Sequence, residues 1–214
     1  MSATAVKLGI SLETQCVSES CNALSGPLRE QLAGGPYDLC SVLPLPLTVA
    51  EWRMEHRTAR KRADRAFGRG YVSDRLERER WADHIYRINT SARERQGRPM
   101  SAGYLAPTEF SPLPDYPCAR HAVRTTGVWH GADLVAYLVM IRAGELALVS
   151  QILGHADHLE NEVMYLLFEH ALRREIDADP GCLVVYNRHD SGTDGLRFFK
   201  ERLGFEEMPV EWLP

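Results

Sequence analysis

The sequence predicts a mixed α/β fold whose sheet is mainly antiparallel. Three observations indicate it: helix-like and strand-like segments alternate along residues 40–214, no internal repeat interrupts them, and three successive strand-like runs are joined by short turns at residues 130–133 and 143–145. Runs joined so closely are expected to pair as an antiparallel meander. Of the 214 residues, 44% are apolar and 25% are charged, which is typical of a globular protein.

The N-terminal residues 1–39 contain Ser, Gly, Pro and Cys without a clear period. We expect them to form an irregular extension with a short helix near residues 27–32. The chain then divides into this extension and one α/β domain, residues 40–214. The first strand of the domain is expected at residues 40–47, where two prolines predict an edge position because proline donates no backbone hydrogen bond.

Two helices are expected next. Thr48 and Glu51 have the spacing of a capping box, and the helix that they begin should continue to Gly68. A second helix is expected at residues 77–95. The apolar face of the first helix is expected to carry Trp52, His56, Ala59, Ala63 and Phe67.

The second half of the domain alternates more regularly. Its last helix should end at Gly204, because glycine readily adopts the positive φ that ends many helices. The elements expected here, in chain order, are strands at 121–129, 134–141 and 146–153, a helix at 161–176, a strand at 182–186, a helix at 192–203 and a strand at 205–212.

Composition argues against several classes of protein. No stretch approaches the roughly 20 apolar residues of a membrane-spanning helix, and the first twenty residues lack the pattern of a signal peptide. Five cysteines without a CxxC pair favour buried thiols in a reduced protein. No third ligand lies near His155 and His158 in the sequence, so no metal is expected. These features predict a cytoplasmic protein without membrane contact.

The order of elements and the segment FFKERLGF at residues 198–205 resemble the GNAT superfamily of N-acyltransferases. The resemblance covers residues 40–214. It implies that strand 146–153 splays from strand 182–186 and that an acyl-CoA donor bonds to the exposed strand edge, with its pyrophosphate at the start of the next helix. The residues that it implies for contact with the cofactor are Ile152, Leu153, Gly154, His158, Asn161 and Asn187.

Two features depart from that family's pattern. The turn after the donor strand lacks the family's glycines and instead carries Asp157, Glu160 and Glu162. Lys200 stands where many members have a tyrosine. An aromatic-Lys pair ahead of a glycine resembles the Fem-type aminoacyl-tRNA-dependent transferases, which implies aminoacyl-tRNA as an alternative donor.

Amide formation requires a base for the proton of the amine and hydrogen-bond donors for the developing oxyanion. The first candidate base is His155, at the end of the expected donor strand. The other candidate catalytic residues are Tyr186, His189 and Lys200. Those expected to bind a carboxylate or phosphate of the acceptor are Arg95, Gln96, Arg98 and Tyr104.

Residues 51–100 hold fourteen Arg or Lys against eight Asp or Glu, a net charge of +6. The arginines of the helix at residues 53–69 suit tRNA or another polyanion. The alternative is a solvated helix face neutralised by Glu51, Glu55 and Asp64.

The sequence therefore predicts an N-acyltransferase that moves an acyl group from acetyl-CoA or another acyl-CoA to the amine of a small molecule. Two alternatives stay open. One is aminoacyl transfer from a charged tRNA, and the other is a non-catalytic GNAT-like binding module. A homodimer is among the expected assemblies.

Overall fold

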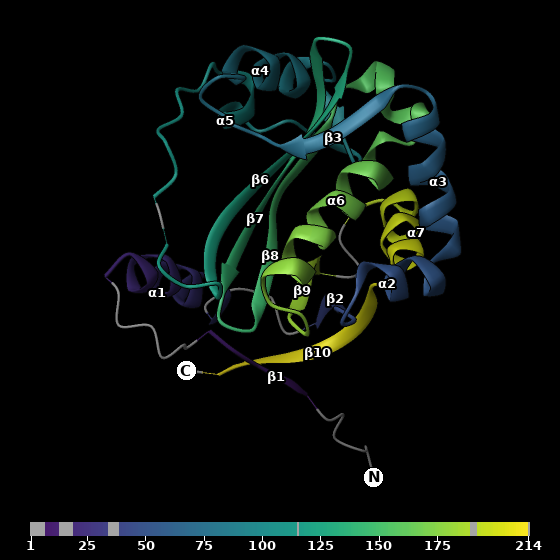
Figure 1. Cartoon of the computed structure of the whole chain (residues 1–214). Coiled ribbons are helices and arrows are strands. Elements are labelled where there is room, and N and C mark those ends of the chain that lie inside the picture. Colours follow the sequence, from purple (N-terminus) through teal and green to yellow (C-terminus); the bar gives the residue numbers. More distant parts are fainter. Residues whose placement is uncertain (1–6, 13–18, 34–38, 115, 189–191, 214) are drawn as a thin grey trace.

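Eight strands form one sheet in the order β1-β10-β2-β9-β8-β7-β6-β3, with helices on both faces (Figure 1). The structure, a computed structural model, describes residues 7–12, 19–33, 39–114, 116–188 and 192–213. The strands of the sheet are β1 (Leu8–Ser11), β2 (Leu39–Pro44), β3 (Tyr71–Arg75), β6 (His121–His130), β7 (Asp133–Ala143), β8 (Leu146–Gly154), β9 (Leu183–Arg188) and β10 (Glu206–Leu213).

A small hairpin, β4 (Glu94–Arg95) with β5 (Arg98–Pro99), lies outside this sheet. Among the described residues, no helix combines the length and apolar character that crossing a lipid bilayer requires. The helices are α1 (Glu19–Ala33), α2 (Val49–Glu55), α3 (Arg57–Gly68), α4 (Ala82–Thr90), α5 (Ala102–Leu105), the 3-10 helix η1 (Ala156–Asn161), α6 (Val163–Ala178) and α7 (Asp194–Leu203).

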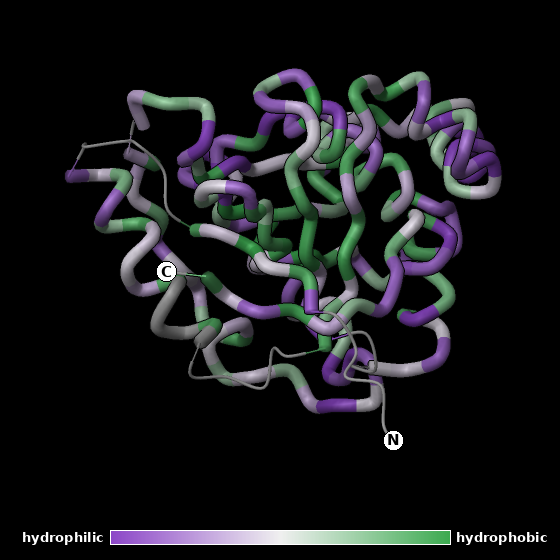
Figure 2. Tube along the Cα trace, turned by 90° about the horizontal axis from the view of Figure 1, so that it is seen from below, coloured by the Kyte–Doolittle hydropathy of each residue, from purple (hydrophilic) through white to green (hydrophobic). Residues whose placement is uncertain are grey.

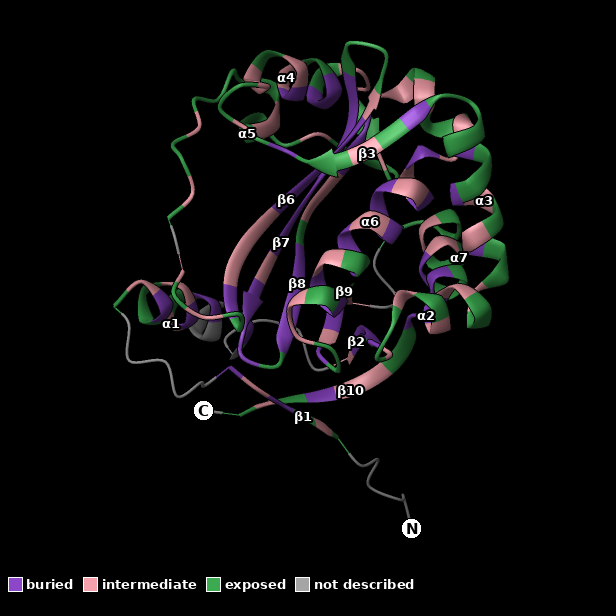
Figure 3. Ribbon diagram, viewed as in Figure 1, coloured by how far each residue is buried: buried purple, intermediate pink, exposed green. Residues whose placement is uncertain are grey.

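Alternate residues of the central strand β7 face two different helix layers. Leu138 and Met140 pack in the core that α3 and α6 cover, whereas Tyr137 and Val139 pack with residues of α4. Burial is concentrated in the central strands (Figure 3), and the same strands carry much of the hydrophobic sequence (Figure 2). The sheet thus separates two cores, and the expected mixed α/β fold is confirmed.

The antiparallel meander of β6, β7 and β8 is also confirmed, within one or two residues of the expected ends. Strands β9 and β10 and helices α6 and α7 lie where the sequence predicts them, to a similar precision. Helix α7 ends at Gly204, which has a φ of 97°. A side chain at this position would also collide with the ring of His56, so both backbone conformation and space require glycine.

Strand β2 is an interior strand, so the expected edge position was wrong. It pairs with β10 on one side and β9 on the other. Pro44 is the last residue of β2, and Pro46 lies beyond its end. Because the strand stops at its first proline, neither ring interrupts the middle of a ladder.

The N-terminal residues are more regular than expected. Strand β1 pairs in parallel with β10, which therefore lies between β1 and β2. Leu28 and Leu32 of α1 pack in a third core with Val42 of β2 and Val210 of β10. Both ends of the described chain thus build the same edge of the sheet.

The first expected helix is broken into α2 and α3. Its capping box is present, since Thr48 Oγ1 accepts from Glu51 N at 3.2 Å and Glu51 Oε2 accepts from Thr48 N at 3.3 Å. The break is at His56, whose φ of −104° and ψ of 58° are not helical and whose ring packs against the end of α7. Phe67 is 65% exposed and Ala66 is buried instead, so the expected apolar face is shifted at its end.

The second expected helix is much shorter than residues 77–95. Only Ala82–Thr90 form α4, with Ile85 and Ile88 buried as expected. Residues 78–81 form turns, and the strand that precedes them, β3, pairs with β6 at the end of the sheet. Strand β3 was not predicted because its sequence, YVSDR, has no clear alternation of apolar and polar residues.

A buried ionic cluster joins α6 to strands β6 and β7. Glu175 Oε2 lies 2.7 Å from Arg124 Nη1 and 3.6 Å from Arg142 Nη1. Arg142 Nη2 also lies 2.7 Å from Asp179 Oδ2. The side chains of Glu175 and Arg142 are each only 1% exposed. Removing one charge from such a cluster leaves another buried without full compensation.

We expect Glu175→Gln to lower the free energy of unfolding by about 3 kcal/mol, because the amide keeps the shape but loses the charge that faces two arginines. Urea denaturation measures the change. Glu201→Gln is the control, since Glu201 pairs with Arg197 on the surface and exposed pairs contribute at most about 1 kcal/mol. Equal effects of the two substitutions would contradict a structural role for the cluster.

Candidate functional site

Strands β8 and β9 separate along their length. They run parallel and pair at Leu146–Leu183, Ala147–Val184 and Leu148–Val185, where the ladder ends. Strand β8 continues to Gly154 and β9 continues to Arg188. The edge of β8 that faces β9 is therefore exposed over the second half of the strand, as the resemblance implied.

A β-bulge in β8 accounts for this separation. Val139 of β7 lies opposite Gln151, whereas the next residue, Met140, lies opposite Val149. Ser150 is therefore an extra residue in β8. A bulge of this kind bends the strand that contains it, and this one begins directly after the last pair with β9.

The space between the diverging strands forms a cavity of about 390 Å³, which we call the wedge cavity. Helices α6 and α7, η1 and the β4–β5 hairpin complete its walls. Its lining is mostly aliphatic and aromatic, with a few polar side chains from residues 94–96. The lining residues are Ala92, Glu94, Arg95, Gln96, Ile152, Leu153, Gly154, Leu159, Met164, Tyr186, Gly195, Leu196 and Phe199.

Gly154 allows the end of β8 to be covered closely. A Cβ atom at this position would lie 2.7 Å from Leu159 Cδ2 and 2.7 Å from Met164 Sδ. Any larger residue would therefore have to displace the side chains of Leu159 and Met164. The sequence analysis named Gly154 but missed Leu159 and Met164, whose role depends on how η1 folds back over the strand.

Arg95 connects the wedge cavity to the exposed strand edge. Its Nη1 donates to the carbonyl of Gly154 at 2.8 Å, and its Nη2 donates to Ile88 O at 2.8 Å and to Ser91 Oγ at 2.9 Å. Its Nε is buried and has no hydrogen-bond partner within the described part of the chain. Burial lowers the pKa of Arg95, but an arginine stays charged at neutral pH. The expected substrate residue Arg95 thus places a positive charge in the cavity wall.

Tyr186 and Lys200 lie together on the β9 side of the wedge. Tyr186 lines the cavity, and the Lys200 ammonium lies 5.0 Å from the centre of its ring. Lys200 is fully buried and donates from Nζ to Arg188 O at 2.6 Å. Burial raises the pKa of Tyr186, so its hydroxyl is protonated at neutral pH and can act as a hydrogen-bond donor.

The structure places His155 and His158 in a different cavity, of about 190 Å³, together with His84 and Asp133. His158 Nδ1 lies 2.9 Å from the hydroxyl of Tyr71. His155 begins η1, and its Nδ1 accepts from the backbone of Asp157. The candidate base is therefore separated from the wedge cavity by the turn that it helps to form.

The remaining expected site residues are dispersed. Gln96 lines the wedge cavity and accepts from Thr193 Oγ1 at 2.7 Å. Asn187, with a φ of 56°, accepts from the backbone of Arg188 through its own side chain. Arg98 is exposed, Tyr104 packs near α4, and Asn161 ends η1. His189 lies outside the described residues.

Four backbone amides in and beside the turn between β8 and α6 donate hydrogen bonds within the protein. The amides of His158, Glu162 and Tyr165 donate to the carbonyls of His155, Leu159 and Glu162, respectively. The amide of Ala156 donates to Ser91 Oγ at 3.0 Å. A phosphate cradle at a helix N-terminus needs amides free to donate to the anion, and these four amides already have partners.

Two arginines of α3 hold the carboxylate that precedes α6. Arg65 makes two hydrogen bonds to Glu162, at 2.6 and 2.5 Å, and Arg62 lies 3.1 Å from the same carboxylate. The hydrogen bond from Arg65 lowers the pKa of Glu162. Arg53 pairs with Asp64 and Glu169. Part of the arginine-rich surface thus stabilises the contact between α3 and α6, although Arg57, Lys61 and Arg69 stay exposed.

Solved structures with the same fold include two lysylphosphatidylglycerol synthetases. The C-terminal domain (DUF2156) of one from Agrobacterium fabrum aligns with a TM-score of 0.55 and 12% identity over 80% of this chain and 58% of its own. L-PGS from Bacillus licheniformis aligns with a TM-score of 0.50 and 10% identity over 80% of this chain and 57% of its own. This chain therefore spans somewhat more than half the length of these two structures.

The ribosomal-protein-S18-alanine N-acetyltransferase from Escherichia coli also matches, with a TM-score of 0.46 and 16% identity over 64% of this chain and 77% of its own. No family model matches the sequence, and the search of curated proteins found no match. The structural neighbours thus include an N-acetyltransferase and lysylphosphatidylglycerol synthetase domains. At these identities, the likeness to the two synthetase structures establishes the fold.

We expect the pKa of His158 to lie below the ordinary value of about 6.5, because burial and the neighbouring His155 and His130 disfavour its charged form. His158 then binds a proton more tightly in the unfolded chain than in the folded protein. The contribution of His158 to stability is therefore complete above about pH 6.5 and declines as the pH falls toward the pKa of the folded state. NMR titration of the ring resonances measures this pKa, and titration in urea gives the unfolded reference. A folded value equal to or above that reference would contradict the prediction.

Proposed function

We propose that this chain is an acyltransferase that holds the acyl group of an activated donor in the wedge cavity and passes it to an amine. The observation that carries the proposal is the unpaired edge of β8 beside a largely apolar cavity, with Arg95 and Tyr186 in its walls. An extended donor can bond to such an edge as an added strand would. An apolar lining excludes water and strengthens the polar interactions made inside it.

The polar groups of the cavity suit the transfer of an acyl group. The amine nitrogen forms a bond to the acyl carbon, the ester or thioester bond of the donor breaks, and the leaving atom takes up a proton. Arg95 and Tyr186 supply donors for the oxyanion that forms at the acyl oxygen. Glu94 supplies a carboxylate in the lining that can accept the proton of the amine.

The turn before α6 favours an aminoacyl ester of tRNA over acyl-CoA as the donor. A coenzyme A pyrophosphate would need free amides at this helix start, but those of residues 156, 158, 162 and 165 have partners within the protein. The carboxylate of Glu162 occupies the same place and already binds the two nearest arginines. An aminoacyl ester makes no such demand, and Arg57, Lys61 and Arg69 on the exposed side of α3 suit an RNA backbone.

The choice of donor is tested by supplying each donor in labelled form with a set of small primary amines. We expect label to pass from aminoacyl-tRNA to an alkali-stable amide, and none to pass from acetyl-CoA. Transfer from acetyl-CoA alone would overturn the choice of donor but keep the acyltransferase. Transfer from neither donor, together with salt-sensitive tRNA binding, would instead support the non-catalytic binding module.

We expect Arg95→Met to lower kcat/KM of this transfer at least about 100-fold, because it removes a charged donor from the cavity wall. Arg93→Met is the matched control. It removes an exposed arginine two residues earlier in the chain, outside the cavity lining, and should leave kcat/KM within about twofold. The melting temperatures of both variants show whether the loss is structural, because Arg95 also bonds to Ile88 and Ser91. Equal kinetics for the two variants would remove Arg95 from the mechanism.

A further inference from the structure

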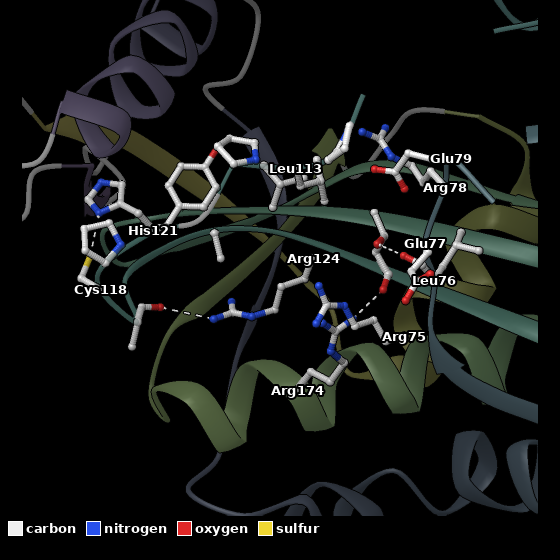
Figure 4. Close-up of a pocket in the computed structure, with 18 of the residues that line it drawn as sticks. Arg75, Leu76, Glu77, Arg78, Glu79, Leu113, Cys118, His121, Arg124 and Arg174 are labelled. Atoms are coloured by element: carbon white, nitrogen blue, oxygen red, sulfur yellow. Dashed lines mark hydrogen bonds between the residues drawn. The ribbon is translucent and has the colours of Figure 1, made fainter. Parts of the chain in front are cut away.

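A third cavity, of about 930 Å³, lies beside the first half of β6, next to α6. The end of β3 and the turn after it, residues 112–114 and 116–119, and the first residues of β6 form its walls (Figure 4). Arg75, Arg124 and Arg174 gather toward one end, and Cys118 and His121 lie at the other. The wedge cavity shares none of these residues.

At the Cys118 end, three side chains that can bind a metal converge from two distant parts of the chain. Cys21 comes from the first turns of α1, and Cys118 and His121 lie at the start of β6. Cys21 Sγ lies 3.8 Å from Cys118 Sγ, and Cys118 Sγ lies 3.2 Å from His121 Nδ1. All three ligand atoms lie within 4.8 Å of one another.

The two separations that involve Cys118 are close to those of ligands around a tetrahedral zinc ion. With Zn–S bonds of about 2.3 Å and a Zn–N bond of about 2.0 Å, tetrahedral angles place two sulfurs about 3.8 Å apart and a sulfur and a nitrogen about 3.5 Å apart. The distance between the two sulfurs agrees, and the sulfur–nitrogen distance needs an adjustment of only a few tenths of an ångström. A disulfide between the cysteines would require their sulfurs to approach to about 2.0 Å.

Ser25 orients the histidine for this role. Its hydroxyl lies 2.8 Å from His121 Nε2, and both residues are buried. When Nε2 carries the ring proton and donates it to Ser25, the lone pair of Nδ1 is directed at Cys118. Metal-binding histidines commonly make such a hydrogen bond through their second nitrogen.

We propose that Cys21, Cys118 and His121 bind a zinc ion that fastens α1 to the start of β6. A site with three protein ligands keeps its fourth position for water or another group. Zinc bound only in the folded state contributes its binding energy to folding. The site would thus help to secure α1, which also packs through Leu28 and Leu32 and makes the hydrogen bond between Ser25 and His121.

No metal was expected from the sequence, because it has no CxxC pair and no third ligand near His155 and His158. Cys21 and Cys118 are 97 residues apart in the chain, so their approach is not visible in the sequence. The local signal was the spacing of Cys118 and His121, three residues apart. That spacing alone is common, and only the fold adds Cys21 to it.

Elemental analysis of the full chain, expressed in zinc-supplemented medium and purified under reducing conditions without chelator, tests the proposal. We expect about one zinc per chain, and less than about a fifth of that in Cys118→Ser. Cys182→Ser is the matched control, because Cys182 is also a buried free cysteine but lies in the core under α6. It should keep the full zinc content.

Cobalt substitution of the wild-type protein gives a readout that needs no variant, so it tests the site even if Cys118→Ser does not fold. We expect the near-ultraviolet absorption of a cobalt–thiolate bond together with visible bands of tetrahedral intensity. Protein that contains no zinc and shows no thiolate absorption with cobalt would overturn the proposal. So would a Cys21–Cys118 disulfide found by mass spectrometry in protein kept under reducing conditions.

Discussion

The end of the β8–β9 ladder at Leu148 and Val185 is the constraint on which the rest of the site depends. Beyond this pair, β8 has backbone groups that no neighbouring strand can satisfy, and unsatisfied backbone groups are costly when buried. Arg95 satisfies one of them, the carbonyl of Gly154. Three features allow this strand edge to stay open inside a packed domain: the bulge at Ser150 bends β8 away from β9, the glycine at position 154 leaves space, and η1 covers the end of the strand.

Several arginines of residues 51–100 form ion pairs that hold the helices around this strand edge together. The positive charge of this segment is therefore partly structural. Arg62 and Arg65 fix Glu162 at the start of α6, while Arg53 holds Glu169 about two helical turns further on. These pairs join α2 and α3 to α6, and α6 provides one wall of the wedge cavity. A charge excess visible in the sequence therefore serves two purposes: it binds helices together, and it leaves a smaller set of exposed cations on α3.

Local patterns predicted the elements whose boundaries are set locally. The meander, α6 and α7 have clear periodicity and turn residues, and their positions are confirmed. The break at His56, the interior position of β2 and the existence of β3 depend on contacts with distant segments, which periodicity does not report. The same distinction applies to the site. The order of elements was enough to place Arg95 and Tyr186 at the site. The cavity that His155 lines depends instead on the path of η1, and the approach of Cys21 to Cys118 depends on where α1 packs.

The gap between β8 and β9 can exist only because β9 is paired on its other side where β8 bends away from it. Strand β2 pairs with β9 from Leu183 as far as Arg188, beyond the point at which β8 leaves it. Strand β10 in turn supports β2, and β1 supports β10. One wall of the cavity is therefore stabilised through strands from both ends of the described chain. This arrangement explains why β1 and α1 form an integral part of the sheet edge: without them, β10 would be an exposed edge strand, and the wall formed by β9 would lose part of its support.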